Sequence, residues 1–300
     1  IGGDHGAERW VLEWCGFVPG KRESRRFVGR YVLREQDVLN STEFPDAIAY
    51  GGWHIDTHPP AGVDATDEEP CTQHRVPKLY DIPLRSCISR NVENLMFAGR
   101  NISATHVAFA STRVMATCAV VGQGVGTAAA FAVRRGLGPA QLVDDSATIA
   151  AVQQQLLRDD AYLIGRKADG VGDFAPSATI TASSFTPGGE PANVASGQTR
   201  SVHGELGAPA DRAFPGTHRW SLADAYTALM QWGRPQPETV RDYAIEIDTG
   251  GGWREIVAVV DNFQRRRVHL LEDAAVVALR VVVQATNGLD QARLCEVRVE

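Results

Sequence analysis

The chain has 300 residues, 44% of them hydrophobic and 22% charged, with a formal net charge of −6 and an isoelectric point near 5.8. These values are typical of folded, soluble protein and leave room for two domains of roughly 150 residues each. The acidic balance excludes an electrostatic case for binding nucleic acid or an anionic membrane, since both require a basic protein surface.

The cysteines and the first residues also exclude some classes of protein. Five cysteines are spread widely along the chain without a Cys-X-X-Cys pair, so a structural zinc or an iron–sulfur cluster has no ligand set. The first residues contain no basic region followed by an apolar core, so we expect no signal peptide there. The sequence reads as beginning partway through a longer protein, and cytoplasmic and secreted bacterial locations both stay open.

The first 136 residues predict a mixture of loops, short strands and one glycine-rich helix. Residues 95–98 are apolar and predict a short buried strand, and Gly99 removes the side chain where the backbone passes close to another group. A polar loop follows, and a helix is predicted to begin near Met115. The free backbone N–H groups at such a helix start can hold an anion or a carbonyl oxygen.

The predicted helix over residues 114–133 contains no charge and is flanked by arginines, so its length would allow a membrane span. Its glycines and polar residues favour a helix buried inside a soluble protein instead. The motif from Gly122 to Gly126 suggests a dinucleotide fingerprint, but Thr127 occupies the third glycine position and the motif lies inside a helix. We therefore interpret these glycines as sites of close helix packing.

Residues 139–158 predict another helix, with Ser146 as its N-cap and apolar residues at helical spacing after it. A linker over residues 165–176 is expected next. The last hundred residues alternate in the manner of half-buried strands and predict an antiparallel sandwich. The expected strands are 243–248, 253–260, 267–271, 278–285 and 293–299. The basic cluster at 265–267 is interpreted as a solvated strand edge.

Residues 92–131, read as a strand, a loop and a helix, closely resemble the C-terminal part of the FAD-dependent oxidoreductases of the glutathione-reductase-like superfamily. The likeness is strongest to the branch related to heterodisulfide reductase A subunits. It also includes the segments 16–26, 46–56 and 80–86, so it covers roughly the first 135 residues. The resemblance implies an α/β flavoprotein portion that is incomplete at its N-terminus.

The resemblance also implies which residues would contact FAD: Ala98, Gly99, Arg100, Met115, Ala116 and Thr117. The first three would line the middle of the cofactor, although Arg100 is equally well explained as an ordinary surface arginine. The last three would direct backbone N–H groups at the flavin O2. The adenosine half has no visible binding site, which implies that this chain carries the flavin side only and that the missing N-terminal portion is a candidate partner.

Six residues are candidates for the substrate side: His54, Asp56, His58, Arg85, His106 and Arg113. Hydride transfer from an alcohol or amine carbon requires a base for the accompanying proton, and histidine titrates in the needed range. We expect His106 to be this base because it lies between the cofactor-contacting strand and the flavin-facing helix; an ordinary loop histidine is the alternative. Arg113 is expected to fix an anion or the flavin, with a structural ion pair as the alternative. The two histidines and one aspartate of residues 54–58 lack a fourth ligand, so we expect no metal.

The C-terminal region resembles galactose-binding-like, discoidin-type modules through its segments 239–246, 252–256 and 261–266. Such modules often bind sugars, but many only pack against their enzyme. Trp220, Trp232 and Trp253 are expected as core anchors, with stacking on sugar rings as the alternative. The implied domains are a flavoprotein portion at 1–138, a helix and linker at 139–175, and a jelly-roll sandwich at 176–300.

Together these features predict an FAD-dependent oxidoreductase that oxidises a small polar or carbohydrate-related substrate by hydride transfer to the flavin. The alternative is a non-catalytic carbohydrate-binding protein whose first half is a degenerate, cofactor-free remnant. An electron-transfer subunit like heterodisulfide reductase A would require clustered cysteines, which the sequence lacks. The expected partner is a small molecule, with no nucleic acid and no membrane span.

Overall fold

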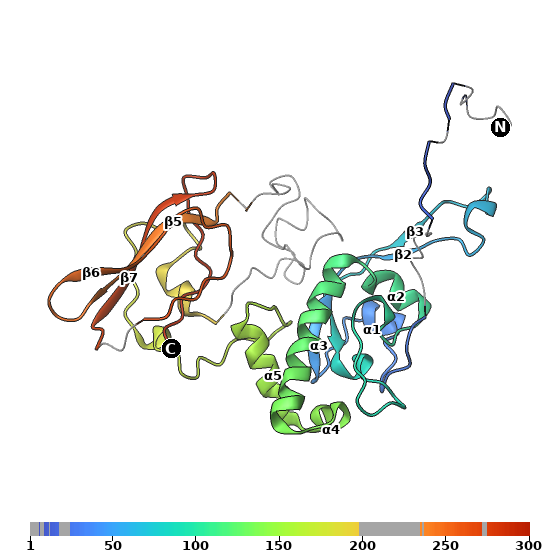
Figure 1. Cartoon of the computed structure of the whole chain (residues 1–300), viewed down its shortest axis with the longest axis horizontal. Helices are drawn as coiled ribbons and strands as arrows, with labels where there is room; N and C mark the ends of the chain where they lie inside the picture. The colour runs from blue at the N-terminus through green and yellow to red at the C-terminus, as the bar shows by residue number, and fades with distance from the viewer. Residues whose placement is uncertain are drawn as a thin grey trace.

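The computed structural model describes residues 25–197, 237–271 and 275–300, together with positions 6, 9–11, 13–17 and 235. An α/β body is built from residues 25–165, and a three-stranded sheet within residues 240–286 lies apart from it (Figure 1). The linker that leaves the last helix of the body runs to the side of the C-terminal region (Figure 1).

Two short strands form the centre of the body. β1 (Ala47–Gly51) is buried along its whole length and pairs antiparallel with β4 (Tyr80–Pro83). Its continuous apolar run is typical of a strand that is covered on both faces. In the register of this pair, Ala47 lies opposite Pro83 and Gly51 opposite Tyr80.

A second antiparallel pair consists of β2 (Ile55–Thr57) and β3 (Thr72–His74). It packs beside α2 (His106–Thr112), while the short helix α1 (Glu35–Leu39) packs against β4. The remaining short turns are 3-10 helices: η1 (Gly62–Asp64), η2 (Leu84–Cys87), η3 (Gly99–Asn101), η4 (Ala175–Ser177) and η5 (Pro191–Ala195).

The stretch before the glycine-rich helix differs from the prediction. The strand expected over residues 95–98 is reduced to a single bridge between Met96 and Ile88. The loop expected after Gly99 contains both η3 and α2. Thr105 begins α2 by accepting a hydrogen bond from the backbone N–H of Ala108 at 3.3 Å, which is the usual role of a threonine N-cap.

The glycine-rich helix α3 (Met115–Arg135) packs on β1. Gly124 is the point of closest approach, since a Cβ at this position would lie 2.6 Å from the carbonyl oxygen of Ile48. Gly122 and Gly126 have no atom within 4 Å of their ideal Cβ positions. The interpretation of these glycines as close-packing sites is therefore confirmed at Gly124, where the partner is a strand, and is wrong for the other two within the described residues.

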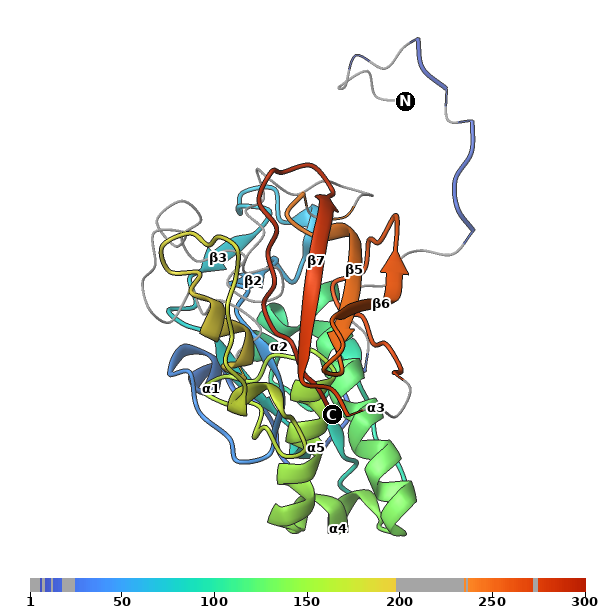
Figure 2. The same cartoon turned by 90° about the vertical axis from the view of Figure 1, so that its left-hand side faces the viewer.

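By length and composition alone, α3 would be able to cross a membrane. Its inner side packs on β1 and α5 (Ser146–Arg158), as expected for a core helix, and Figure 2 shows α3 and α5 running alongside each other. Only 33% of its most apolar stretch is buried within the described residues. The predicted buried helix is thus buried on one side, and its other side, which includes Ala119 and Ala130, is exposed.

Two helices occupy residues 139–158, where one was expected. α4 (Pro139–Asp144) ends before Asp145, whose carboxylate accepts a hydrogen bond from the N–H of Ala147 and so caps α5. Ser146, expected as the cap, is the first residue of α5. The predicted apolar positions are buried in the same core as β1: Ile149, Val152, Leu156 and Leu157.

The C-terminal region contains one antiparallel sheet in the order β6 (Trp253–Val259), β5 (Val240–Asp248), β7 (Ala278–Thr286). The described residues hold no second sheet facing it, so the jelly-roll sandwich stays a prediction. Trp253, expected as a core anchor, is 44% exposed and lies beneath the Arg280 guanidinium, 4.2 Å from its ring centroid. Trp220 and Trp232 lie outside the described residues.

Two of the expected strands are wrong, because neither residues 267–271 nor residues 293–299 form a strand. The C-terminal residues line the linker instead. The N–H of Val297 donates to the carbonyl of Val194, and the N–H of Phe174 donates to the carbonyl of Val299, both at 2.8 Å.

The arginine cluster is exposed to solvent, as predicted, but it lies against the end of α5 and not on a strand edge. Arg265 pairs with Asp160 at 2.8 Å and Arg266 with Asp159 at 3.5 Å. Arg266 also donates to the carbonyl oxygen of Arg158 at 3.2 Å, where a cation opposes the negative end of the helix. We call these four paired side chains, Asp159, Asp160, Arg265 and Arg266, the α5 seam.

Candidate active site

Three of the predicted substrate-side residues meet where β2 lies beside the end of α2. Arg113 caps the C-terminus of α2, and its guanidinium lies 3.0 Å from a carboxylate oxygen of Asp56 and 3.2 Å from Nε2 of His58. The Nε2 atom of His58 is 3.7 Å from the other Asp56 oxygen. The side chains of Arg113 and Asp56 are only 13% and 16% exposed, whereas that of His58 is 44% exposed. The cluster therefore consists of a largely buried ion pair, Arg113 with Asp56, and one side chain, His58, that is open to solvent.

Hydrogen bonding determines the tautomer of His58. A guanidinium can only donate, so Nε2 of His58 must accept from Arg113 through its lone pair. Nδ1 lies 2.9 Å from the carbonyl oxygen of Pro70, which can only accept, so Nδ1 carries the proton. The ring is therefore neutral in this arrangement, with its basic nitrogen beside Arg113 and Asp56.

Arg85 lies elsewhere. Arg85 follows β4 and forms an ion pair with the buried Asp46. Its Nη2 lies 3.0 Å from one carboxylate oxygen of Asp46, and its Nε donates to the other at 3.1 Å. Asp46 immediately precedes β1, and Asp56 lies beyond the other end of that strand. A strand of five residues spans roughly 13–17 Å, so Arg85 is separated from the cluster by the length of β1. Its geometry is that of a structural ion pair.

Two further candidates, His106 and His54, have surroundings that differ from those of His58. His106 is the first residue of α2, whose other end leads to Arg113, and the rise between these two residues is about 10 Å. His54 is buried, 7% exposed, with its ring 4.4 Å from that of Trp53.

The start of α3 carries the predicted cofactor-side residues Met115, Ala116 and Thr117. Val114 is the N-cap and its side chain accepts no hydrogen bond, so the first N–H groups of the helix have no side-chain cap. Met115 is 89% exposed. The hydroxyl of Thr117 is fully buried and has no hydrogen-bond partner among the described residues.

The second predicted cofactor-side segment, from Ala98 to Arg100, packs against α3 as part of η3. Gly99 has a φ of +85°, and no atom lies within 4 Å of the position its Cβ would take, so space is open beside the backbone here. Burial raises the pKa of the Cys118 thiol in α3, and the positive charge of Arg100 acts in the opposite direction. Arg100 therefore lies near the first turns of α3.

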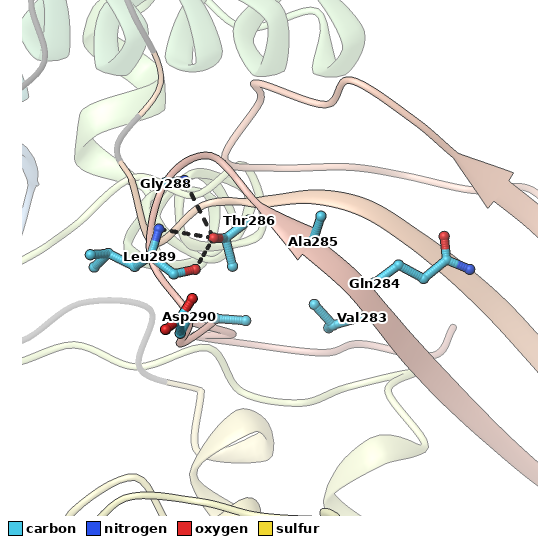
Figure 3. A pocket seen from close by; sticks show the side chains of 8 residues that line it. Val283, Gln284, Ala285, Thr286, Gly288, Leu289 and Asp290 are labelled. Atoms are coloured by element: carbon cyan, nitrogen blue, oxygen red, sulfur yellow. Dashed lines mark hydrogen bonds between the residues drawn. The ribbon is translucent and has the colours of Figure 1, made fainter.

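Two other kinds of site are not supported. The described residues contain no group of three or more histidine, cysteine, aspartate or glutamate side chains that would hold a metal. A hollow of about 460 Å³ lies along β7 and the turn after it, far along the chain from the cluster (Figure 3). Its only labelled hydroxyl, Thr286, already accepts from the backbone N–H groups of Gly288 and Leu289.

A family model described as FAD dependent oxidoreductase matches residues 4–156, which are 153 of the 300 residues. The chain belongs to this family of FAD-dependent oxidoreductases. It is an enzyme of this class with FAD as its cofactor and an α/β flavoprotein fold. No curated protein and no solved structure matches the chain.

The described residues of this oxidoreductase fit the flavin end of FAD on three observations. The start of α3 has no side-chain cap, the buried Thr117 hydroxyl in its first turn has no partner, and Gly99 leaves open space beside its backbone. Uncapped N–H groups suit an acceptor oxygen that carries negative charge. The sequence lacks the glycine fingerprint that would hold the adenosine end of the cofactor at a strand-to-helix turn.

Sequence reasoning found the members of the cluster but not their association. Asp56 and His58 are close in the sequence, within residues 54–58, but nothing in the sequence links them to Arg113. The contact between Arg113 and His58 joins residues 55 positions apart and depends on β2 packing beside α2. No local sequence pattern predicts such packing. Tyr80 and Ser111, which lie beneath the cluster, were missed altogether, because a single buried hydroxyl leaves no signal in a sequence.

Proposed function

We propose that the flavin end of FAD lies at the start of α3 and that the substrate lies against Arg113, Asp56 and His58. When bound, FAD accepts a hydride and gains negative charge. The uncapped N–H groups of Met115 to Thr117 would stabilise that charge. Arg113 and Asp56 would bind and orient a small polar substrate.

A single observation carries this proposal: the cluster and the start of α3 adjoin. Arg113 caps α2 and is followed directly by Val114, the N-cap of α3. Val114 and Ala116 pack in a small apolar group with Trp53, which lies three residues before Asp56. A molecule held by the N–H groups of α3 therefore has the cluster as its neighbour.

His58 is the first candidate for the proton acceptor. Its Nε2 is unprotonated, and a substrate that takes over the hydrogen bond from Arg113 would free the Nε2 lone pair to accept a proton; the ring is also partly open to solvent. His106 is the second candidate and stays the prediction made from the sequence. His58 ranks first because it lies at the end of α2 that leads into α3, whereas His106 lies at the other end of α2.

The finer identity of the enzyme is also part of the proposal. The likeness of residues 92–131 supports the branch related to heterodisulfide reductase A subunits, without that subunit's clustered cysteines. The likeness of the C-terminal region to discoidin-type modules supports a second, sandwich-like domain and a carbohydrate-related substrate.

Replacing Met115 tests the position of the flavin. Proline is well accommodated at the first position of a helix but has no N–H, so Met115→Pro removes one donor and leaves α3 intact. Val114 already has the extended conformation that precedes proline, with φ −70° and ψ 148°. A hydrogen bond to a charged acceptor contributes about 1.5–3 kcal/mol, so affinity for reduced FAD should fall roughly 10- to 100-fold relative to oxidised FAD.

The matched control is Met115→Ala, which keeps the N–H group and should preserve the wild-type ratio of the two affinities. Both dissociation constants can be measured by titrating the full chain with oxidised FAD and with dithionite-reduced FAD. If Met115→Pro binds both forms in the wild-type ratio, the flavin does not lie at the start of α3.

A further inference from the structure

Beneath the cluster, a chain of two hydrogen bonds joins three elements of the body. The Ser111 hydroxyl lies 2.5 Å from the carbonyl oxygen of Trp53 and 2.7 Å from the Tyr80 hydroxyl. Ser111 has one hydroxyl hydrogen, which it donates to the Trp53 carbonyl, so the Tyr80 hydroxyl must donate to Ser111. Both Ser111 and Tyr80 are fully buried.

The three residues occupy particular places in the fold. Ser111 is in the last turn of α2, two residues before Arg113. Trp53 is in the loop between β1 and β2 and leads through His54 into Asp56. The hydrogen bond between Ser111 and Trp53 thus joins the helix that presents Arg113 to the loop that presents Asp56 and His58.

Tyr80 is itself held in one position. It lies opposite Gly51 in the strand pair, and a Cβ on residue 51 would come within 2.3 Å of the Tyr80 ring. Only glycine at position 51 therefore allows the ring to lie where its hydroxyl reaches Ser111. Burial raises the pKa of the Tyr80 hydroxyl above its ordinary value, so the hydroxyl stays protonated and remains a donor.

We propose that Ser111 is a positioning residue of the active site: through the Trp53 carbonyl it fixes the β1–β2 loop against α2, and so keeps His58 within reach of Arg113. This inference rests on the proposed function for its catalytic meaning. Its physical content is independent of flavin, because it concerns the contact between Arg113 and Nε2 of His58, at 3.2 Å in this structure.

The tautomer of His58 reports that contact directly. In the wild-type chain, donation from Arg113 to Nε2 and from Nδ1 to Pro70 should hold the ring in the Nδ1–H form. Long-range ¹H–¹⁵N spectra of histidine-labelled full-length protein distinguish the two ring nitrogens, and His58→Gln identifies the signal. In Ser111→Ala, we expect the two nitrogen shifts to move toward each other as the single tautomer is lost.

Tyr80→Phe is the matched control. It removes a buried hydroxyl from the same network but leaves the bond between Ser111 and Trp53, so thermal stability should fall while the His58 shifts stay at wild-type values. Ser111→Cys, which preserves side-chain size with a weaker donor, should give shifts between those of wild type and Ser111→Ala. It also provides a folded variant if Ser111→Ala does not fold.

Two results would overturn the inference. The first is that the His58 nitrogen shifts are unchanged in both Ser111 variants. The second is that Tyr80→Phe moves these shifts as far as Ser111→Ala does, which would mean that loss of any buried hydroxyl loosens the packing around His58. Neither result bears on the position of the flavin, which the two Met115 variants test separately. Failure of the one proposal is therefore distinguishable from failure of the other.

Discussion

His106 begins α2, and His58 lies beside Arg113 at the other end of that helix, so each histidine serves as the control for the other. Removing a general base slows a reaction by about 10²–10⁴-fold. We expect His58→Gln to slow reduction of the bound flavin to that extent, because its Nε2 lies in the cluster with Arg113 and Asp56. His106→Gln should stay within a few-fold of wild type.

The measurement is single-turnover flavin reduction by a substrate found in a screen of small alcohols, polyols and amines. Both variants should bind FAD as the wild type does. The reverse ranking, with His106→Gln slow and His58→Gln fast, would restore the assignment made from the sequence and would separate the base from the cluster.

Asp81 supports a prediction about stability and pH. It is 2% exposed, accepts from the N–H of Phe44 at 3.0 Å and lies 3.6 Å from Arg166. Burial is the main cause that raises its pKa from 3.8 to about 6; Arg166 acts to lower it and Glu43 to raise it. Because the folded pKa lies above the unfolded one, the folded state binds this proton more tightly, and stability from this group rises as pH falls from about 7 to about 4.

Asp81→Asn removes that titration and should flatten this part of the stability profile. A shift from 3.8 to about 6 corresponds to at most roughly 3 kcal/mol between the two pH limits. Urea unfolding of both proteins between pH 4 and 7.5 measures the difference. If the difference in unfolding free energy between the wild type and Asp81→Asn does not change with pH, Asp81 is not the group that titrates.

At the scale of elements, two glycines of α3 give a matched pair of substitutions. Gly124→Ala would place a Cβ 2.6 Å from the Ile48 carbonyl oxygen, so we expect a loss of about 1–3 kcal/mol in unfolding free energy through overpacking. Gly126→Ala meets open space and should instead stabilise by roughly 0.5–1 kcal/mol, since alanine is the better helix former. Chemical denaturation compares them, and equal effects would mean that α3 does not pack on β1 at Gly124.

The elements that the sequence predicted well are those whose signal is local. The start of α3 near Met115, the apolar positions of α5 and three of the five C-terminal strands follow from residue type and spacing alone. The α2 helix was missed, although Thr105 is a good N-cap, because its seven residues are too short for a clear helical period. Residues 293–299 alternate like a strand, but their backbone pairs with the linker, and alternation cannot identify a partner.

The same distinction applies to the candidate site. Residue chemistry identified Asp56, His58 and Arg113, because histidine, carboxylate and arginine are the side chains that proton transfer and anion binding require. Arg85 has the same chemistry but is committed to Asp46, and only the strand register shows that it lies at the other end of β1. Residue type therefore identifies candidate site residues, but tertiary packing determines which of these side chains come into contact.

At the scale of the whole molecule, the described parts meet at the end of α5. The family match ends at residue 156, and the contacts to the C-terminal region begin directly after it, in the α5 seam and at the carbonyl of Leu157, to which Arg298 donates at 3.3 Å. Exposed ion pairs such as those of the seam contribute about 0–1 kcal/mol each. The domain bounds at residues 138 and 175 stay predictions.

The C-terminal tail should therefore hold the two parts together more firmly than the seam does. Its backbone bonds to Val194, Phe174 and Asp173 contribute about 0.5–1.5 kcal/mol each, and they connect the end of the chain to the linker. Deleting residues 294–300 should leave the α/β body folded but speed proteolysis within residues 165–197 and separate a single calorimetric transition into two. Arg293→Ala is the control, because it removes only a half-exposed ion pair with Glu238 at 3.6 Å and leaves the tail in place. If truncated and wild-type chains show the same cleavage rate and one shared transition, the tail contributes nothing to the connection, and the seam alone must supply it.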